Sequence, residues 1–127
     1  MRFMMLVKSA ENSGPPPKEP MEALWKSGEE AAKAGVMIDS GGLKPTAMSA
    51  RVQLRGGKVT AIDGPFTESK EIIGGFAIFE FKSVQEAIES AKDFMELHRK
   101  YWPGWQGETE VRPMFGKDEF IAGTHER

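Results

Sequence analysis

The apolar positions of the chain follow two periods, and the shorter one predicts strands in the sheet centre. In residues 3–7, FMMLV, successive side chains fall on opposite faces of a strand and every one is apolar. The run 75–81 is also apolar on both faces, apart from Glu80. Strands with two apolar faces are typical of a covered, central position. We therefore expect these two segments to be central neighbours in one sheet.

The longer period predicts two helices. The first helix spans residues 20–34, between Pro20 as a start signal and Gly35 as a stop signal, and carries a stripe of Met21, Leu24, Trp25, Gly28, Ala31 and Ala32. The second helix follows a Ser83–Glu86 capping box and ends before Pro103. Its stripe recurs at intervals of four, three, four and three residues, at Val84, Ile88, Ala91, Met95 and His98. Both helices should be amphipathic.

Four further segments are predicted to be strands, and two of them are joined by a tight turn. Residues 51–55 and 58–62 alternate apolar and polar side chains on either side of Gly56-Gly57, which predicts a β-hairpin with one solvent-exposed face. A short strand is expected at 36–38. The last strand is expected at 108–115, where Pro113 favours a sheet edge or a strand end.

The order of these elements predicts an α+β, ferredoxin-like βαββαβ fold with an inserted β-hairpin. Its sheet should be antiparallel, with both helices on one face. The opposite face would then present more apolar surface than a soluble monomer normally exposes. We therefore expect a homodimer in which this face is covered by a second subunit.

Length and composition bound the protein further. The 127 residues suit one domain, predicted at 1–116, followed by a flexible C-terminal tail at 117–127. A net charge of −2 with interspersed signs argues against nucleic-acid binding. The chain has no cysteine, which fits a reducing, cytoplasmic location. The apolar run at the start, about five residues long, is too short for a signal peptide or a membrane span.

Candidate chemistry is concentrated in residues 63–76, DGPFTESKEIIGGF. Asp63 begins a Gly-Pro turn, and it either shapes the loop alone or also faces a ligand as a base or hydrogen-bond acceptor. Phe66 is interpreted as an apolar plug. Glu68 and Lys70 form either an exposed pair or a site that polarises an oxygen or orients a water.

A second group of candidates lies at the end of the second helix. His98 is either a satisfied core histidine or cap, or a proton shuttle oriented by a carboxylate. Trp102 and Trp105 either line an apolar ligand pocket or serve core and dimer packing. Arg112 would clamp a carboxylate if it faced that pocket. No metal or cofactor motif is present, so neither a metal nor a cofactor is expected. His125, in the tail, is interpreted as solvated.

Several stretches together resemble the YCII-related, or DGPF-domain, family over about residues 2 to 115: RFMMLVK, AGV, DGPFTESKE, GGF and ELHRKYWPGWQGETEVRPM. The resemblance implies a small bacterial protein with a dimeric α+β barrel fold. The wider superfamily includes a dehydrochlorinase-like enzyme acting on a chlorinated lactone, and some DGPF proteins are associated with extracytoplasmic-function sigma factors. Its better studied branch carries a His-Asp pair with the histidine on the first helix, where this chain has Leu24 and Trp25. His98 and Asp63 are an alternative pair.

The sequence thus supports two functional hypotheses. In the first, a homodimer binds a small oxygenated organic molecule in a cleft between the DGPF loop, the end of the second helix and the turn at 102–105. Acid-base elimination or isomerisation would use His98 or Asp63 as the base, with Lys70 or Arg112 polarising an oxygen. In the alternative, the protein is a non-catalytic ligand-sensing or regulatory module associated with a sigma factor.

Overall fold

The computed structural model describes residues 1–11, 18–116 and 119, without the side chains of 18–21 and 23–25. The stripe expected through Met21, Leu24 and Trp25 lies outside the described side chains, and the tail expected at 117–127 lies outside the described residues apart from Glu119. The elements are β1 (Arg2–Ser9), α1 (Lys18–Lys33), β2 (Met37–Gly42), the 3-10 helix η1 (Thr46–Met48), β3 (Ala50–Arg55), β4 (Lys58–Asp63), β5 (Ile72–Glu80), α2 (Val84–Tyr101) and β6 (Gly107–Pro113).

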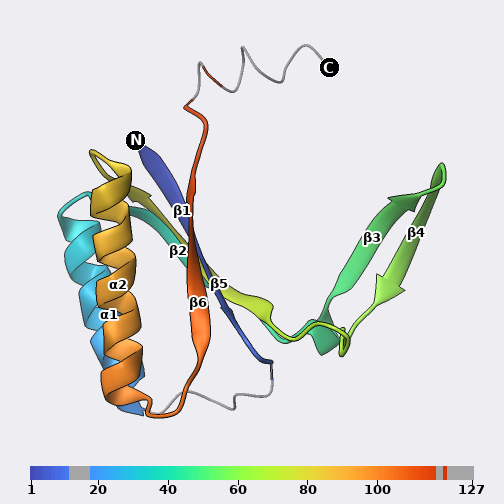
Figure 1. Cartoon of the computed structure of the whole chain (residues 1–127), viewed down its shortest axis with the longest axis horizontal. Coiled ribbons are helices and arrows are strands. Elements are labelled where there is room, and N and C mark those ends of the chain that lie inside the picture. The colour runs from blue at the N-terminus through green and yellow to red at the C-terminus, as the bar shows by residue number, and fades with distance from the viewer. Residues whose placement is uncertain (12–17, 117–118, 120–127) are drawn as a thin grey trace.

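Four strands form an antiparallel sheet in the order β2-β5-β1-β6 (Figure 1). The two strands with apolar residues on both faces, β1 and β5, are its central neighbours, as the sequence predicted. Pro113 is the last residue of the edge strand β6, where its missing N–H is tolerated. The α+β class is confirmed, and this strand order is compatible with a ferredoxin-like fold.

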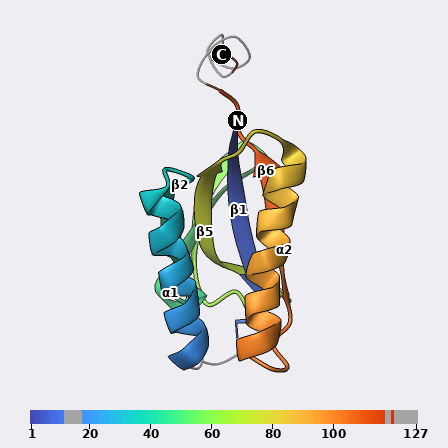
Figure 2. The same cartoon turned by 90° about the vertical axis from the view of Figure 1, so that its left-hand side faces the viewer.

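Both helices cover the same face of the sheet (Figure 2). The core lies between the sheet and α2. It consists of Phe3 and Met5 from β1 and Ala87 and Ala91 from α2, with Phe79, Phe81 and Val111 packed around it. The predicted helix start is confirmed, because the Ser83 hydroxyl accepts a hydrogen bond of 3.2 Å from the backbone N–H of Glu86. The sheet, α1 and α2 are called the body below.

The opposite face of the sheet, called the open face below, is also apolar at its centre. In β1 and β5 the register pairs Met4 with Ile78 and Leu6 with Phe76 on this side, between the residues that face the helices. These four side chains are only half-buried. Both helices lie on the other side of the sheet (Figures 1 and 2). Within the single chain, then, the centre of the open face stays partly exposed.

Strands β3 and β4 form a separate antiparallel pair, residues 50–63, which projects from the body and is called the arm below (Figure 1). Gly56 and Gly57 make the turn with φ values of 57° and 76°, the left-handed geometry that a two-residue hairpin turn requires. The sequence predicted that one face of the hairpin is exposed to solvent, but in the structure the apolar face is exposed as well. The reason is that the arm does not fold back over the body.

Candidate functional site

The DGPF motif lies where the arm rejoins the body, and it packs against η1. The Gly64 N–H donates to the Ser49 carbonyl at 2.9 Å, and a Cβ added at Gly64 would lie 1.7 Å from the Thr46 carbonyl oxygen. Only glycine fits so close an approach. Phe66 is 6% exposed and its N–H donates to the Thr46 hydroxyl at 3.2 Å. The interpretation of Phe66 as a plug is confirmed.

Arg51, at the base of the arm, covers this plug. Its guanidinium carbon lies 3.7 Å from the Phe66 ring centroid, a cation-π contact. The same guanidinium donates to the Glu68 carboxylate at 2.6 Å and to the Ser69 hydroxyl at 3.1 Å. Backbone hydrogen bonding within Glu68 and the bond from Arg51 lower the pKa of that carboxyl. Glu68 therefore pairs with Arg51, whereas the sequence suggested Lys70, which is exposed.

Glu11, in the turn after β1, is hydrogen-bonded to η1 beside the DGPF motif. The Glu11 carboxylate accepts hydrogen bonds from the N–H and the hydroxyl of Thr46, and these bonds lower the pKa of Glu11. We call Glu11, Thr46, Arg51, Gly64 and Phe66 the junction. Its contacts join the turn after β1, η1, the first strand of the arm and the DGPF loop, so the junction fixes where the arm leaves the body.

His98 belongs to a different group of residues, at the C-terminal end of α2. It is 6% exposed, and its ring centroid lies 4.4 Å from that of Trp105, 4.7 Å from that of Phe94 and 6.4 Å from that of Trp102. Its Nδ1 lies 3.0 Å from the Phe94 carbonyl oxygen. A carbonyl only accepts, so Nδ1 carries the hydrogen, and in the neutral ring Nε2 is left as an acceptor. The side chain of His98 is buried, as its place on the apolar stripe of the second predicted helix indicated.

The tight turn after α2 builds the rest of this group, which we call the His98 cluster (Phe94, His98, Trp102 and Trp105). The Trp102 N–H donates to the His98 carbonyl at 2.8 Å, and the Trp105 N–H donates to the Trp102 carbonyl at 3.1 Å. The Trp105 indole then lies against Gly107 at the start of β6, where a Cβ would come within 2.5 Å of it. The cluster thus fills the space between the end of α2 and β6.

Arg112 and Asp63 lie away from the His98 cluster. Arg112 lies on the open face, opposite Met4 in the register, with its Nε 3.3 Å from the Glu110 carboxylate. Asp63 is the exposed last residue of β4 in the arm. One chain therefore brings His98, Trp102 and Trp105 together, but it leaves Asp63, Glu68, Lys70 and Arg112 outside that group.

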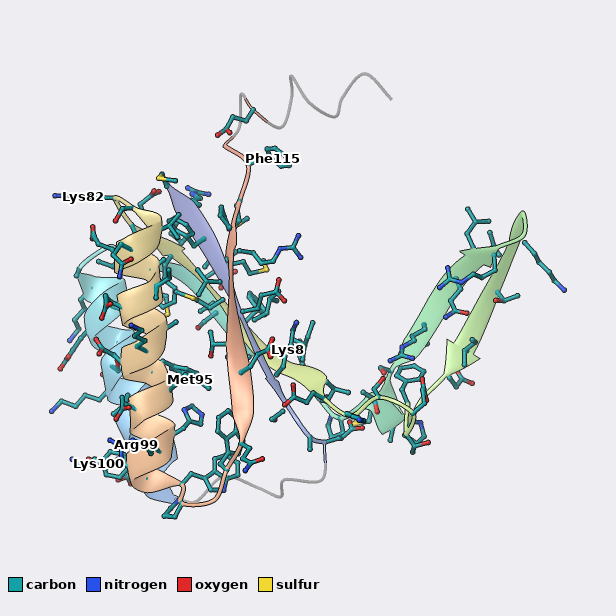
Figure 3. The ribbon with its side chains drawn as sticks, in the orientation of Figure 1. Lys8, Lys82, Met95, Arg99, Lys100 and Phe115 are labelled. Atoms are coloured by element: carbon teal, nitrogen blue, oxygen red, sulfur yellow. The ribbon has the colours of Figure 1, made fainter. Side chains whose placement is uncertain are left out.

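The structure adds a charged group that the sequence analysis did not single out. On the open face Lys8 donates to Glu110 at 2.5 Å and lies 3.9 Å from Glu108. The Glu110 bond raises the pKa of Lys8, and the Lys8 bond lowers the pKa of Glu110. Figure 3 shows Lys8 on the side of the sheet away from Met95 in α2. The position of Lys8 directly after an apolar run was visible in the sequence. Its partner Glu110 was not, because the two residues are brought together by the pairing of β1 with β6.

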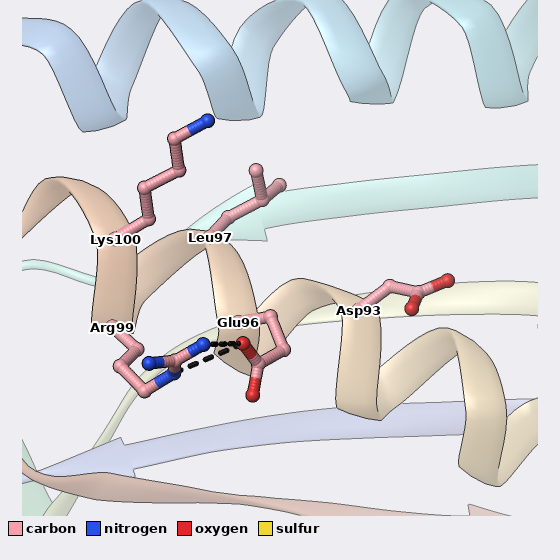
Figure 4. Close-up of a pocket in the computed structure, with 5 residues that line it drawn as sticks. All are labelled: Asp93, Glu96, Leu97, Arg99 and Lys100. Carbon is pink, nitrogen blue, oxygen red and sulfur yellow. Dashed lines mark hydrogen bonds and ion pairs between the residues drawn. The ribbon is translucent and has the colours of Figure 1, made fainter.

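A second feature missed from sequence is a shallow hollow of about 400 Å³ along α2, where Leu97 and Lys100 point toward α1 and Glu96 and Arg99 point away from it (Figure 4). It is lined by Asp93, Glu96, Leu97, Arg99 and Lys100. Arg99 donates two hydrogen bonds to Glu96, so these charges already satisfy one another. The pair is of the i, i+3 type common on solvated helices. This pair therefore needs no ligand to satisfy its charges.

Among residues 1–11, 18–116 and 119, no three His, Asp or Glu side chains are grouped as they would be around a metal ion. In that same part of the chain, neither helix combines the length and the apolar composition that crossing a membrane requires.

Comparison with known proteins agrees with the resemblance read from the sequence. The profile of the YCII-related domain matches residues 1–101, and the chain belongs to this family. A relative, the uncharacterized protein R00369 of Rhizobium meliloti (strain 1021), is 31% identical over 94 residues, which cover 74% of this chain and 69% of that protein. The family match covers the body apart from β6, the junction, the arm, and Phe94 and His98 of the His98 cluster. The comparisons therefore establish kinship and assign no reaction.

Proposed function

We propose that the protein is a homodimer that binds a small oxygenated organic molecule beside the His98 cluster. One observation carries this proposal: a buried histidine has its Nδ1 hydrogen committed to a carbonyl, which presents Nε2 among aromatic rings. Aromatic walls with one oriented polar atom are typical of sites for small organic ligands. The other polar contacts of such a ligand would come from outside the cluster.

The proposed reaction is an acid-base elimination or isomerisation. Nε2 would remove a proton from a carbon next to an oxygen-bearing group, and the imidazolium formed would be stabilised by the Phe94 carbonyl at Nδ1. Asp63 lies in the arm, across the sheet from α2. A pair between His98 and Asp63 therefore requires the Asp63 of a second copy, and the same holds for Lys70 or Arg112 as the group that polarises the oxygen.

The homodimer part of the proposal is supported by the open face. Met4, Leu6, Phe76 and Ile78 form an apolar centre that neither helix covers. Contiguous apolar surface of this kind marks an interaction site in soluble proteins. A second copy can cover it by a self-complementary, two-fold contact.

The test is a thermal-shift screen of small oxygenated acids, lactones and ketones, followed by NMR of the histidine ring nitrogens. A ligand of the proposed site raises the melting temperature by mass action and moves the Nε2 signal of His98. His98→Phe keeps an aromatic ring but removes Nε2, so it should abolish that binding. His125→Ala is the matched control, because it removes the chain's other histidine and assigns the remaining signal.

The outcomes separate the two functional hypotheses. Turnover of a binder that is lost in His98→Phe supports the enzyme. Binding without turnover at the same cluster supports the alternative, a non-catalytic ligand-sensing module. Binders that leave the His98 signal unmoved and bind His98→Phe equally well would contradict the proposed site.

A further inference from the structure

One face of the arm is apolar from its turn to the middle of its strands, and at its base the pair of Ala50 and Asp63 adds one carboxylate to the same face. The register places Val52 opposite Ala61 and Leu54 opposite Val59, so these four side chains lie on the same side of the two strands. Val52, Leu54 and Val59 are 72%, 63% and 68% exposed. A two-stranded hairpin is at best marginally stable in water without a covering layer. The residues of this face are therefore of the kind usually buried in a protein, yet in the single chain they are exposed to solvent.

The arm is nevertheless held firmly where it leaves the body. Phe66 is buried beneath Arg51, and Gly64 lies against the Thr46 carbonyl without room for a Cβ. Arg51 belongs to the arm, and Gly64 is the residue that directly follows it. A hairpin whose base is fixed in this way presents its apolar face in a set direction, which suits docking to a defined surface.

Charge indicates what that surface is. The arm carries Arg51, Arg55 and Lys58 against Asp63 alone, a net charge of +2. Because the whole chain has a net charge of −2, the remaining residues carry −4. Two arms would repel one another, whereas an arm and the body of another copy attract. The open face offers an apolar centre for the valines and leucine. Beside it, Glu108 and Glu110 of β6 lie on the same side, where Glu110 pairs with Lys8 and Arg112. The attraction is therefore that of the whole remaining chain and not of a local acidic patch.

We infer that the apolar face of the arm packs on the open face of a second copy of this chain, and that the second copy's arm does the same in return. This rests on the homodimer in the proposed function but is independent of the ligand at His98. In the complex the arm contributes Val52, Leu54 and Val59 to an apolar interface with the centre of the partner's open face. The DGPF motif then serves to aim the arm.

Cross-linking tests this docking directly, because the chain has no cysteine of its own. One variant carries Val59→Cys in the arm and the other carries Leu6→Cys on the open face, with tags of different size. The control pairs Leu6→Cys with Thr60→Cys, which is also exposed but lies on the other face of the arm. After mixing and mild oxidation, we expect the Val59 pair to give at least tenfold more mixed disulfide than the Thr60 pair.

Equal yields from the two pairs, or a Val59 product formed only between two arms, would overturn the inference. A dissociation constant provides a second, milder readout. Val52→Thr with Val59→Thr preserves branched strand residues but adds hydroxyls, and should weaken the dimer at least tenfold. Gln53→Thr with Thr60→Val, on the other face, should leave it within twofold.

An unchanged dissociation constant in the Val52→Thr, Val59→Thr variant would show a dimer that does not use the arm. Such a result would remove this inference and leave the proposed homodimer intact. A wild-type chain that stays monomeric would remove both. Neither result bears on ligand binding at His98, which the ring-nitrogen signal reports separately.

Discussion

The body and the arm are both built from strands with alternating side chains, yet only the body has a core. In β1 the alternation places Phe3 and Met5 on the helix-covered face, against Ala87 and Ala91 of α2, where they are 0% and 4% exposed. In β3 the same alternation places Val52 and Leu54 toward solvent. The pattern that forms a strand therefore does not determine what covers it. Two strands alone supply no second layer, so the arm depends on something outside its own fold.

The largest effect that would sharpen this contrast is expected from Phe3→Ala. Phe3 is fully buried against α2, so its truncation leaves a cavity in the core and should lower the free energy of unfolding by about 3–5 kcal/mol. Urea denaturation at a fixed protein concentration measures it. Phe115→Ala is the control, because Phe115 is 65% exposed and should lose less than about 1 kcal/mol. Equal losses at the two positions would contradict the assigned core.

Gly64→Ala should disrupt the junction between the body and the arm. The added methyl group would overlap the Thr46 carbonyl, so η1 or the DGPF loop must shift, at a cost of about 2 kcal/mol or more. The matched control is Gly74→Ala, where a Cβ meets no atom within 4 Å. Thermal unfolding of both variants provides the comparison. A Gly64→Ala protein as stable as the control would show that the close approach at the junction is wrong.

Ser83→Ala changes the body alone. It removes the side-chain acceptor for the Glu86 N–H at the start of α2, which should cost about 1 kcal/mol. Ser27→Ala, an exposed position in α1, should have no such cost. Because the cap lies in the body, dimer dissociation measured under native conditions should be unchanged in both variants. A change in dissociation would mean that the body and the arm are not separable as described.

The smallest effect concerns the pH dependence of the junction. Thr46 lowers the pKa of Glu11 below its ordinary value of 4.5, so the charged carboxylate stabilises the folded state above that pH. This stabilisation is lost as pH falls below 4.5 and through the lower folded pKa. Glu11→Gln should therefore be less stable than wild type at neutral pH, with a difference that shrinks in acid.

Urea titrations from pH 7 to pH 3 measure this difference. Thr46→Val, which removes the hydroxyl donor, should reduce the effect of Glu11→Gln in the double variant. A difference between wild type and Glu11→Gln that stays constant through the acid range would contradict the assignment.

The elements whose signals are local could be predicted from sequence. The Gly56-Gly57 turn requires positive φ at both residues, and the Ser83 cap needs only its own helix, so neither depends on distant contacts. The strand at Met37–Gly42 extends beyond the predicted 36–38, because Gly41 and Gly42 are not typical strand residues and gave no strand signal. Gly41 lies beneath the Phe76 ring, which leaves no room for a side chain. That reason lies in another strand.

The candidate site was predictable only in part for the same reason. His98, Trp102 and Trp105 meet because they share the end of one helix and its turn, so their spacing was informative. The contact of Arg51 with Phe66, and that of Lys8 with Glu110, join residues brought together by the register of the strands. Helical periodicity carries no information about such pairs, so Arg112 and Asp63 were grouped with His98 although one chain holds them apart.

Sedimentation equilibrium of the wild-type chain is the most direct test of the central claim, that the open face and the apolar arm are covered by a second copy. The expected result is a species of twice the 14.1 kDa chain mass at micromolar concentration. Leu6→Lys, which places a charge at the centre of the open face, should shift it to 14.1 kDa. A wild-type protein that sediments at 14.1 kDa throughout the concentration range would contradict the account.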